Sequence, residues 1–261
     1  MKPALITVVN PQDNDVISDQ LLYYKNIGIN DFYIMLHMPD IKLMSICEAF
    51  RDKYTDKNIH LFINSKPEHY HEKDCKVLSD AALEDGCDWI IGSDADELLV
   101  LKRHKTIQGF LSECGLTRFH SLHFQWFEYR PLENIYESAL RFMTNRETIP
   151  RQQSKSIGKF NKEMAYVPGL HYIENSPQVI NINTDIAFYA HFSDRNKEQY
   201  ISKMTLQAKN WNQRYGKYTH WAEKLIEDDS EGLEKLWNLM LEQNKSKELF
   251  YDPMNIWMFS E

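Results

Sequence analysis

The sequence predicts an α/β fold built on a mostly parallel sheet that is flanked by helices. Short apolar runs rich in β-branched residues alternate with longer segments whose apolar residues recur at helical spacing. The strand-like runs contain few alternating polar residues, which is typical of strands buried on both faces of a parallel sheet. Regular alternation of strands and helices produces parallel strands joined by right-handed connections.

The N-terminal half supplies most of this pattern. Its strands are expected over residues 4–9, 32–36, 59–63 and 89–91. Its helices are expected over residues 16–27, 43–54, 68–84 and 106–114. Gly28 and Gly86 follow two of these helices, at the position where a glycine commonly ends a helix.

The C-terminal half is less regular. Strands are expected over residues 121–129 and 186–192, and helices over residues 197–211, 221–226 and 233–241. Residues 130–168 follow no clear period and are rich in Arg, Lys, Asn and Gln, which fits either a functional loop or a plain surface excursion. The apolar end, residues 254–259, is expected to dock on the body rather than to face a partner or a membrane.

The composition argues against several classes of protein. With 43% hydrophobic and 26% charged residues, the chain is globular rather than disordered. A net charge of −8 argues against broad nucleic-acid binding, which depends on a basic surface. Dinucleotide and P-loop sites have no support, because neither glycine-rich motif is present. We expect a cytoplasmic protein with free thiols, because the chain shows no membrane-length apolar run, no leader pattern and no C-x-x-C spacing.

The most informative stretch runs from Asp88 to Leu99. Its apolar centre opens into Gly-Ser and then into Asp94, Asp96 and Glu97, at the carboxyl end of a predicted strand, where open α/β sheets bind ligands. In an extended chain Asp94 and Asp96 point to the same side. Two such carboxylates suit Mg²⁺ or Mn²⁺ shared with the phosphates of a substrate. A polar strand end that caps the next segment is the competing interpretation.

Three blocks in chain order resemble the family 2 glycosyltransferases of the GT-A fold, in the bacterial branch with a D-W-hydrophobic-hydrophobic-x-x-D-x-D-E-hydrophobic signature. The first block is Asp88 to Leu98. The second joins Ser138 to Phe142 with Lys155 to Ile157, and the third joins His171 with His191 to Arg195 and Gln199 to Lys203.

The resemblance covers about residues 4–210. It implies a GT-A-like, Rossmann-like glycosyltransferase domain over residues 1–210 and a helical C-terminal extension over residues 211–261 that packs on it. It further implies a hexosyltransferase that uses Mn²⁺ or Mg²⁺, inverts the sugar and takes a UDP-linked nucleotide sugar as donor. The implied acceptor is a cell-surface glycan or glycolipid, such as lipopolysaccharide or capsule, reached from the cytoplasm with peripheral contact at the inner face of the membrane.

The resemblance also implies roles for individual residues. The expected metal ligands are Asp94, Asp96 and His191, with His171 as the second choice of histidine. The expected contacts to the nucleotide and its diphosphate are Asp94, Asp40, Lys155, Arg195 and Lys203. An inverting transfer needs a general base near the acceptor hydroxyl, and Glu128 and Glu97 are the candidates, with Glu133 as a rival.

Two other classes of function compete with this interpretation. A metal-dependent phosphohydrolase could use Asp94, but such enzymes generally carry an acid at the end of the first strand, where this chain has Val8-Val9-Asn10. A non-catalytic carbohydrate-binding protein of GT-A shape is favoured by turns at residues 10–13 and 37–40 that differ from those of the family. The retained acids count against that second alternative.

Overall fold

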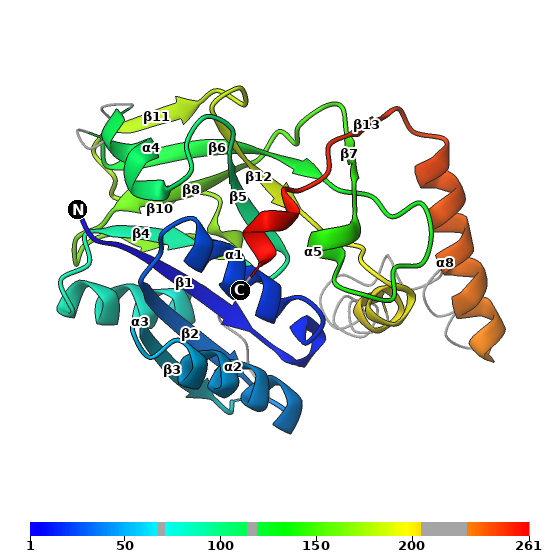
Figure 1. Cartoon of the computed structure of the whole chain (residues 1–261), viewed down its shortest axis with the longest axis horizontal. Coiled ribbons are helices and arrows are strands. Elements are labelled where there is room, and N and C mark those ends of the chain that lie inside the picture. Colours follow the sequence, from blue (N-terminus) through cyan, green and yellow to red (C-terminus); the bar gives the residue numbers. More distant parts are fainter. Residues whose placement is uncertain (67–70, 114–118, 205–228, 261) are drawn as a thin grey trace. The chain divides into compact units, whose positions relative to one another are not determined.

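The computed structural model describes residues 1–66, 71–113, 119–204 and 229–260 (Figure 1). Contacts divide the chain into two compact units. The first unit contains Met1–Glu128, Ile149–His191 and Asn255–Glu261, and the second contains Tyr129–Thr148 and Phe192–Met254.

The first unit is built on a nine-stranded sheet with the strand order β3-β2-β1-β4-β8-β6-β12-β5, in which β11 also pairs with β6. The strands are β1 (Pro3–Val9), β2 (Asp31–His37), β3 (Asn58–Asn64), β4 (Trp89–Gly92), β5 (Glu97–Leu101), β6 (Ser121–Glu128), β8 (Ser154–Lys159), β11 (Val179–Ile182) and β12 (Ala187–His191). Five pairs are parallel, and the pairs β4–β8, β6–β8 and β5–β12 are antiparallel. The predicted α/β class with a mostly parallel sheet is confirmed.

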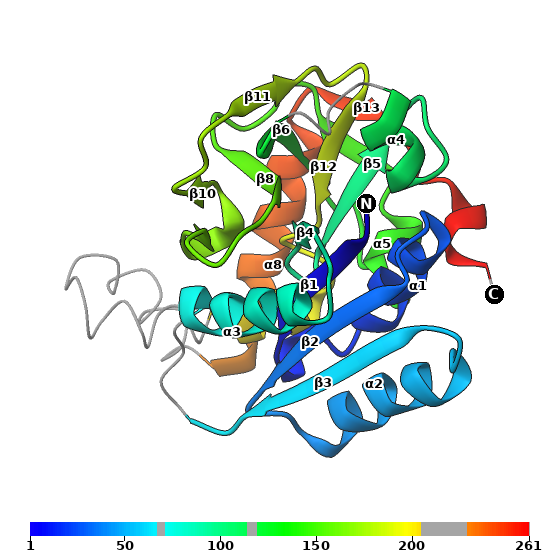
Figure 2. The same ribbon diagram turned by 90° about the vertical axis from the view of Figure 1, so that its left-hand side faces the viewer.

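Helices α1 (Ile17–Asn26), α2 (Ile41–Lys53), α3 (His71–Glu84) and α4 (Ile107–Glu113) connect the first strands. The chain moves outward from β1 to β3 and then returns to place β4 on the other side of β1. Figure 2 shows α3 on the opposite side of this part of the sheet from α2. The reversal between β1 and β4 is the kind of topological switch point at which open α/β sheets bind ligands.

Apolar side chains along one face of β1 form a core with α3. Ala4, Ile6 and Val8 alternate along the strand and belong to one buried cluster with Leu78 and Ala82 of the helix. The continuous burial of β1 and β4 agrees with the expectation that these strands are covered on both faces. This core fixes the end of β4 relative to its neighbours.

Three strands of the sheet, β5, β8 and β11, are not predicted from the sequence. β8 lies within residues 130–168, for which we expected a loop or a surface excursion, and that expectation is wrong for residues 154–159. β5 begins at Glu97, the last of the three acids, and β11 covers Val179–Ile182. The same C-terminal region of the first unit also holds the short β9 (Ala165–Tyr166), a 3-10 turn (Pro168–Leu170) and β10 (Ile173–Glu174).

The second unit contains α5 (Ala139–Phe142), α8 (Asp229–Lys245) and the antiparallel pair of β7 (Asn145–Glu147) with β13 (Leu249–Tyr251). Residues 197–204 are helical, as predicted, and α8 contains the helix expected over residues 233–241. The remainder of the helix expected to reach residue 211 and the helix expected over 221–226 lie outside the described residues. None of the described helices has the length and apolar character that a membrane-spanning helix requires.

The C-terminal apolar stretch docks on the first unit, as the sequence predicts. Its 3-10 turn, Ile256–Phe259, packs against α1, and Phe259 is 2% exposed. The ring of Phe259 lies 5.7 Å from that of Tyr23. Asn26 at the end of α1 donates to the carbonyls of Met258 and Ser260 at 3.0 and 2.9 Å. Apolar burial and two backbone contacts therefore hold this end of the chain.

We expect Phe259→Ala to release the C-terminal turn, because replacing a buried Phe by Ala removes up to about 3–5 kcal/mol of packing. Trimming by carboxypeptidase, followed by mass spectrometry, should then proceed faster than in the unchanged protein. Ile149→Ala is the control, because Ile149 is 75% exposed in the same unit. Equal trimming of Phe259→Ala and the control would show that this ring does not hold the turn.

Candidate active site

Gly92 ends β4 in a crowded position that only glycine fits. A Cβ atom at this residue would lie 2.8 Å from a Leu170 methyl carbon and 2.9 Å from the Tyr166 ring. The Tyr166 hydroxyl accepts a hydrogen bond from the Gly92 amide at 3.0 Å and donates to the Ile90 carbonyl at 2.9 Å. The Tyr189 hydroxyl donates to the Gly92 carbonyl at 3.1 Å. Two tyrosines thus satisfy the backbone at the strand end.

Ser93, the next residue, is fixed in the same manner. Its hydroxyl receives a hydrogen bond from Tyr24 at 2.9 Å and donates to the Glu97 carbonyl at 3.0 Å. Gln20 of α1 donates to the Asp94 carbonyl. All three anchoring side chains, Tyr24, Ser93 and Gln20, are buried. The acids that follow therefore start from a rigid turn.

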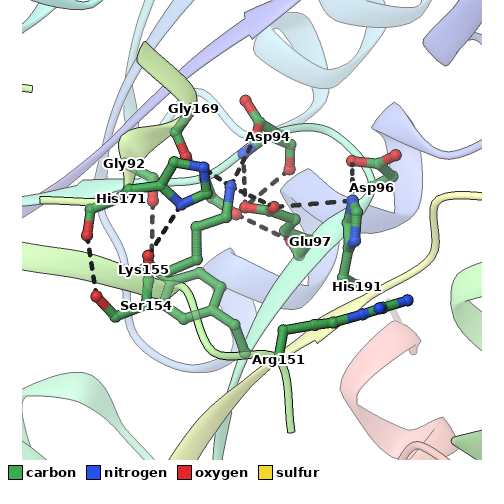
Figure 3. Close-up of polar contacts among 12 residues, drawn as sticks. Gly92, Asp94, Asp96, Glu97, Arg151, Ser154, Lys155, Gly169, His171 and His191 are labelled. Carbon is green, nitrogen blue, oxygen red and sulfur yellow. Dashed lines mark hydrogen bonds and ion pairs between the residues drawn. The ribbon is translucent and has the colours of Figure 1, made fainter. Parts of the chain in front are cut away.

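Lys155 of β8 lies between two of the acids (Figure 3). Its ammonium nitrogen is 2.6 Å from Glu97 Oε1 and 3.1 Å from Asp94 Oδ2, and it donates to the Gly169 carbonyl at 2.7 Å. Lys155 is 2% exposed and Glu97 is fully buried. His71 at the start of α3 approaches the other oxygen of Asp94 at 3.2 Å. Asp94 and Glu97 are therefore neutralised inside the protein.

The pKa values of these groups follow from burial and from their partners. Burial works against the charged form of Asp94, but Lys155 and His71 hold its pKa well below the usual range. Burial raises the pKa of Glu97 to about 7, although Lys155 opposes this shift. Burial would lower the pKa of Lys155, but Glu97 and Asp94 raise it above its ordinary value. The lysine is a permanent cation at physiological pH.

The second half of the site is a cluster of two acids and a histidine. His191 Nε2 lies 3.7 Å from Asp96 Oδ1 and 3.9 Å from Glu97 Oε1. The possible ligand atoms of these three residues all lie within 4.8 Å of one another. Two carboxylates and an imidazole nitrogen at this spacing can hold a divalent cation, and three protein ligands leave positions open for a substrate.

The sheet register brings these groups together. In β12 His191 pairs with Glu97 of β5 on one side and with Glu128 of β6 on the other. Glu128 Oε1 lies 2.7 Å from His191 Nδ1. A carboxylate on the second nitrogen of a metal-binding histidine fixes the orientation and the protonated nitrogen of the ring. Burial would lower the pKa of His191, but Asp96 and Glu128 raise it.

Two further side chains lie beside the cluster and were not expected from the sequence as site residues. The Trp126 ring lies 4.5 Å from the ring of His191, and Lys155 Nζ is 5.4 Å from the Trp126 centroid. Arg151 is labelled in Figure 3. Its side chain is 44% exposed, and its Nε is 3.9 Å from Glu128 Oε1. The sequence indicates Trp126 only as part of a strand and Arg151 only as part of an irregular segment.

The structure brings six of the residues predicted for the site into one cluster, which comprises Asp94, Asp96, Glu97, Glu128, Lys155 and His191. The metal-ligand group found among the described residues contains His191 and not His171. His171 Nδ1 instead lies 3.0 Å from the Ser154 carbonyl.

The other predicted residues are Asp40 in the first unit and three residues of the second unit. Asp40 caps α2 by accepting from the Leu43 amide at 2.7 Å. Glu133, Arg195 and Lys203 belong to the second unit, where Lys203 donates to the Ser193 carbonyl at 2.8 Å. The functional roles of all these residues stay predictions.

No protein-family model matches the chain, and neither does any curated protein. Among solved structures, the chain is similar to TarS residues 1–349 from S. aureus in complex with UDP-GlcNAc, with 13% identity and a TM-score of 0.49. That match covers 81% of this chain and 67% of TarS 1–349; the match to TarS 1–349 alone covers 66% of its length.

HddC from Yersinia pseudotuberculosis matches with 10% identity and a TM-score of 0.41, over 77% of this chain and 97% of HddC. A putative nucleotide-diphospho-sugar transferase from Desulfovibrio desulfuricans G20 matches with 10% identity and a TM-score of 0.37, over 90% of this chain and 98% of that one. These distant likenesses do not assign the chain to a family.

We expect Lys155→Met to destabilise the protein by about 3–5 kcal/mol, because removing one partner of a buried ion pair leaves uncompensated charge on Asp94 and Glu97. Urea unfolding at neutral pH measures this loss. Lys159→Met is the matched control, since Lys159 is an exposed lysine on the same strand. A loss no larger than that of the control would show that Lys155 does not neutralise the two acids.

Proposed function

We propose that this protein is a metal-dependent glycosyltransferase that moves a hexose from a UDP-linked nucleotide sugar to a cell-surface glycan, with inversion at the sugar carbon. The observation that carries the proposal is the convergence of Asp96, Glu97 and His191 at the carboxyl end of a buried parallel strand. The acceptor we propose is lipopolysaccharide, capsule or a related glycolipid, reached at the cytoplasmic face of the membrane.

The donor set supports a cation that is shared with a diphosphate. Hard divalent ions take oxygen ligands and commonly keep part of their coordination shell for substrate phosphates. Asp96 and His191 keep partial exposure beside fully buried Glu97, so a ligand can approach from the open side. When bound, the cation would neutralise the charge that builds on the leaving diphosphate.

The chain's own residues prepare this site in distinct ways. Lys155 and His71 neutralise Asp94, so the three neighbouring acids do not all repel one another. Arg151 is exposed next to the cluster and can move to pair with a phosphate oxygen. Trp126 offers a ring beside His191 on which the apolar face of a sugar can pack.

Glu128 has a contact that suggests a role other than the general base. Glu128 is 4% exposed, and its carboxylate is hydrogen-bonded to His191. We therefore assign Glu128 to positioning the histidine, and we keep Glu97 and Glu133 as the remaining sequence-based candidates for the base. Glu97 also stands among the proposed metal ligands.

The phosphohydrolase alternative gains nothing from the structure at the end of β1. Asn10 stands there, and its side chain accepts from the Gln12 amide at 2.9 Å as the cap of a 3-10 turn (Pro11–Asp13). The non-catalytic alternative predicts binding of a nucleotide sugar or glycan without turnover. The products distinguish the three possibilities. A glycosyltransferase releases UDP, a phosphohydrolase releases inorganic phosphate, and a binding protein releases neither.

We expect Asp96→Asn to lower Mn²⁺-dependent hydrolysis of UDP-sugars by about 100-fold or more, because losing several kcal/mol of charge stabilisation costs a factor of ten per 1.36 kcal/mol. UDP release from UDP-glucose, UDP-galactose and UDP-GlcNAc measures the effect. The exposed Glu163→Gln is the control and should retain full activity. Unchanged turnover in Asp96→Asn, or release of inorganic phosphate instead of UDP, would end the proposal.

We expect Glu128→Ala to weaken Mn²⁺ affinity by about 10–100-fold, because the ring of His191 loses the group that orients it. Glu128→Gln keeps a hydrogen-bond acceptor for Nδ1, so it should recover most of the affinity and most of the rate at saturating Mn²⁺. Manganese titrations of UDP release provide both values. If Glu128 is the base instead, both variants lose the rate equally and their metal affinity does not change.

A further inference from the structure

An open groove of about 510 Å³ lies in the first unit, apart from the cluster of acids. Three segments form its walls: residues 123–125 of β6, residues 152–154 at the start of β8, and residues 181–184 at the end of β11. Its polar side chains include Gln125, Gln152, Gln153, Asn181, Asn183 and Thr184. The volume falls in the range of small-molecule sites.

The lining of this groove carries no charged residue. This is unusual in a chain in which 26% of the residues are charged. The other lining side chains are His123, Phe124, Ser154 and Ile182, and burial lowers the pKa of His123, which favours the neutral ring. A groove of this kind does not attract phosphate or carboxylate groups, and its amides would be a poor match for an apolar ligand.

Most of the amides are available for a ligand. Within the part of the chain that the structure describes, no hydrogen bond or ion pair occupies the side chains of Gln125, Gln152, Gln153 and Asn181, and all four are exposed. The Nε2 atom of His123 is buried without a hydrogen-bond partner. Each amide offers two donor hydrogens and an acceptor oxygen. Side chains with both functions match hydroxyl groups, which also donate and accept.

The groove shares two strands with the catalytic cluster. Gln125 lines the groove, and the next residue, Trp126, contacts His191. Gln153 lines the groove, and Lys155 two residues later binds Asp94 and Glu97. Two residues of extended chain span at most about 7 Å, so the backbones of Gln153 and Lys155 are close neighbours. Successive side chains of a strand point to opposite faces, so Gln125 and Trp126 lie on opposite faces of β6, and the groove and the cluster are connected through residues 153–155.

We propose that this groove binds an uncharged, hydroxyl-rich segment of the acceptor glycan, at a distance from the hydroxyl that reacts. The inference rests on the proposed function, because the acceptor glycan is a substrate of that reaction. Neutral hexose and N-acetylhexosamine units fit the amide lining, and uronic or sialic acids do not. The groove thus selects the acceptor and leaves the donor to the cluster of acids.

The test uses the full chain and an array of oligosaccharides that presents neutral hexose and N-acetylhexosamine glycans beside uronic-acid and sialic-acid glycans. We expect at least one neutral glycan to bind. The double variant Gln153→Ala with Asn181→Ala should weaken that binding about tenfold or more. The matched control is Gln178→Ala, since Gln178 is an exposed amide next to β11 and does not line the groove. It should bind as the unchanged protein does.

Three results would overturn the inference: binding of no neutral glycan, stronger binding of acidic glycans, or equal binding by the double variant and the unchanged protein. Release of UDP in the absence of acceptor reports on the proposed function separately. Normal UDP release without glycan binding would refute the groove alone. Groove-dependent glycan binding without UDP release would refute the transferase and would show that the groove is a sugar site in a binding protein.

Discussion

The site depends first on the buried ammonium group of Lys155. Two carboxylates about 4 Å apart repel by about 4 kcal/mol even when the surroundings screen them as a protein surface does. Here Asp94, Asp96 and Glu97 follow one strand end within four residues, and Glu97 is fully buried. The lysine binds two of these acids and a backbone carbonyl. The dependence is mutual, since a buried lysine without these acids would lose its proton. Neutralising Asp94 and part of Glu97 leaves Asp96 and His191 as the groups that a ligand can still engage.

The second constraint is strand register. β12 pairs antiparallel with β5 and parallel with β6, so Glu97, His191 and Glu128 lie in one row across three strands. The row is possible because the chain changes from a parallel to a mixed sheet beyond β4. A shift of β12 by one residue would turn His191 to the other face of the sheet. Tyr166, Tyr189 and Tyr24 fix the backbone and the hydroxyl of the Gly92–Ser93 turn. They thereby also fix the position of the acidic residues that follow this turn.

The sequence predicts the first four strands well, although β3 is only partly buried. β1 to β4 are apolar runs bounded by glycine or polar residues, and their predicted ends lie within one residue of those observed. The prediction fails at β8, whose residues Ser154 to Lys159 contain only one large apolar side chain. β8 nevertheless lies in the middle of the sheet, because its buried polar side chains find partners there. Ser156 donates a hydrogen bond to the His171 carbonyl, and Lys155 forms an ion pair with Glu97. Six residues of the cluster could be predicted from motif and position, whereas His71, Trp126 and Arg151 could not. The pairing of the site residues could not be predicted either, because Lys155 and His71 reach Asp94 from places 61 and 23 residues away, through tertiary contacts that no local pattern records.

The weak strand signal of β8 and the chemistry of its surroundings have a common cause. A central strand is normally stabilised by the burial of apolar side chains. Polar residues in such a strand therefore indicate that its side chains serve a functional site. Residues 151–155 place two cations near the acids and three neutral polar residues along the groove. On β6, Trp126 likewise lies beside His191 of the cluster, whereas Gln125 lines the groove. Charge is thus concentrated where a diphosphate and a divalent ion would be held, and it is absent where we place uncharged sugars. In this arrangement the neutral sugars of the acceptor and the charged diphosphate of the donor do not compete for one surface. The groove has no charged side chain for a diphosphate, and the cluster has few neutral amides for sugar hydroxyl groups.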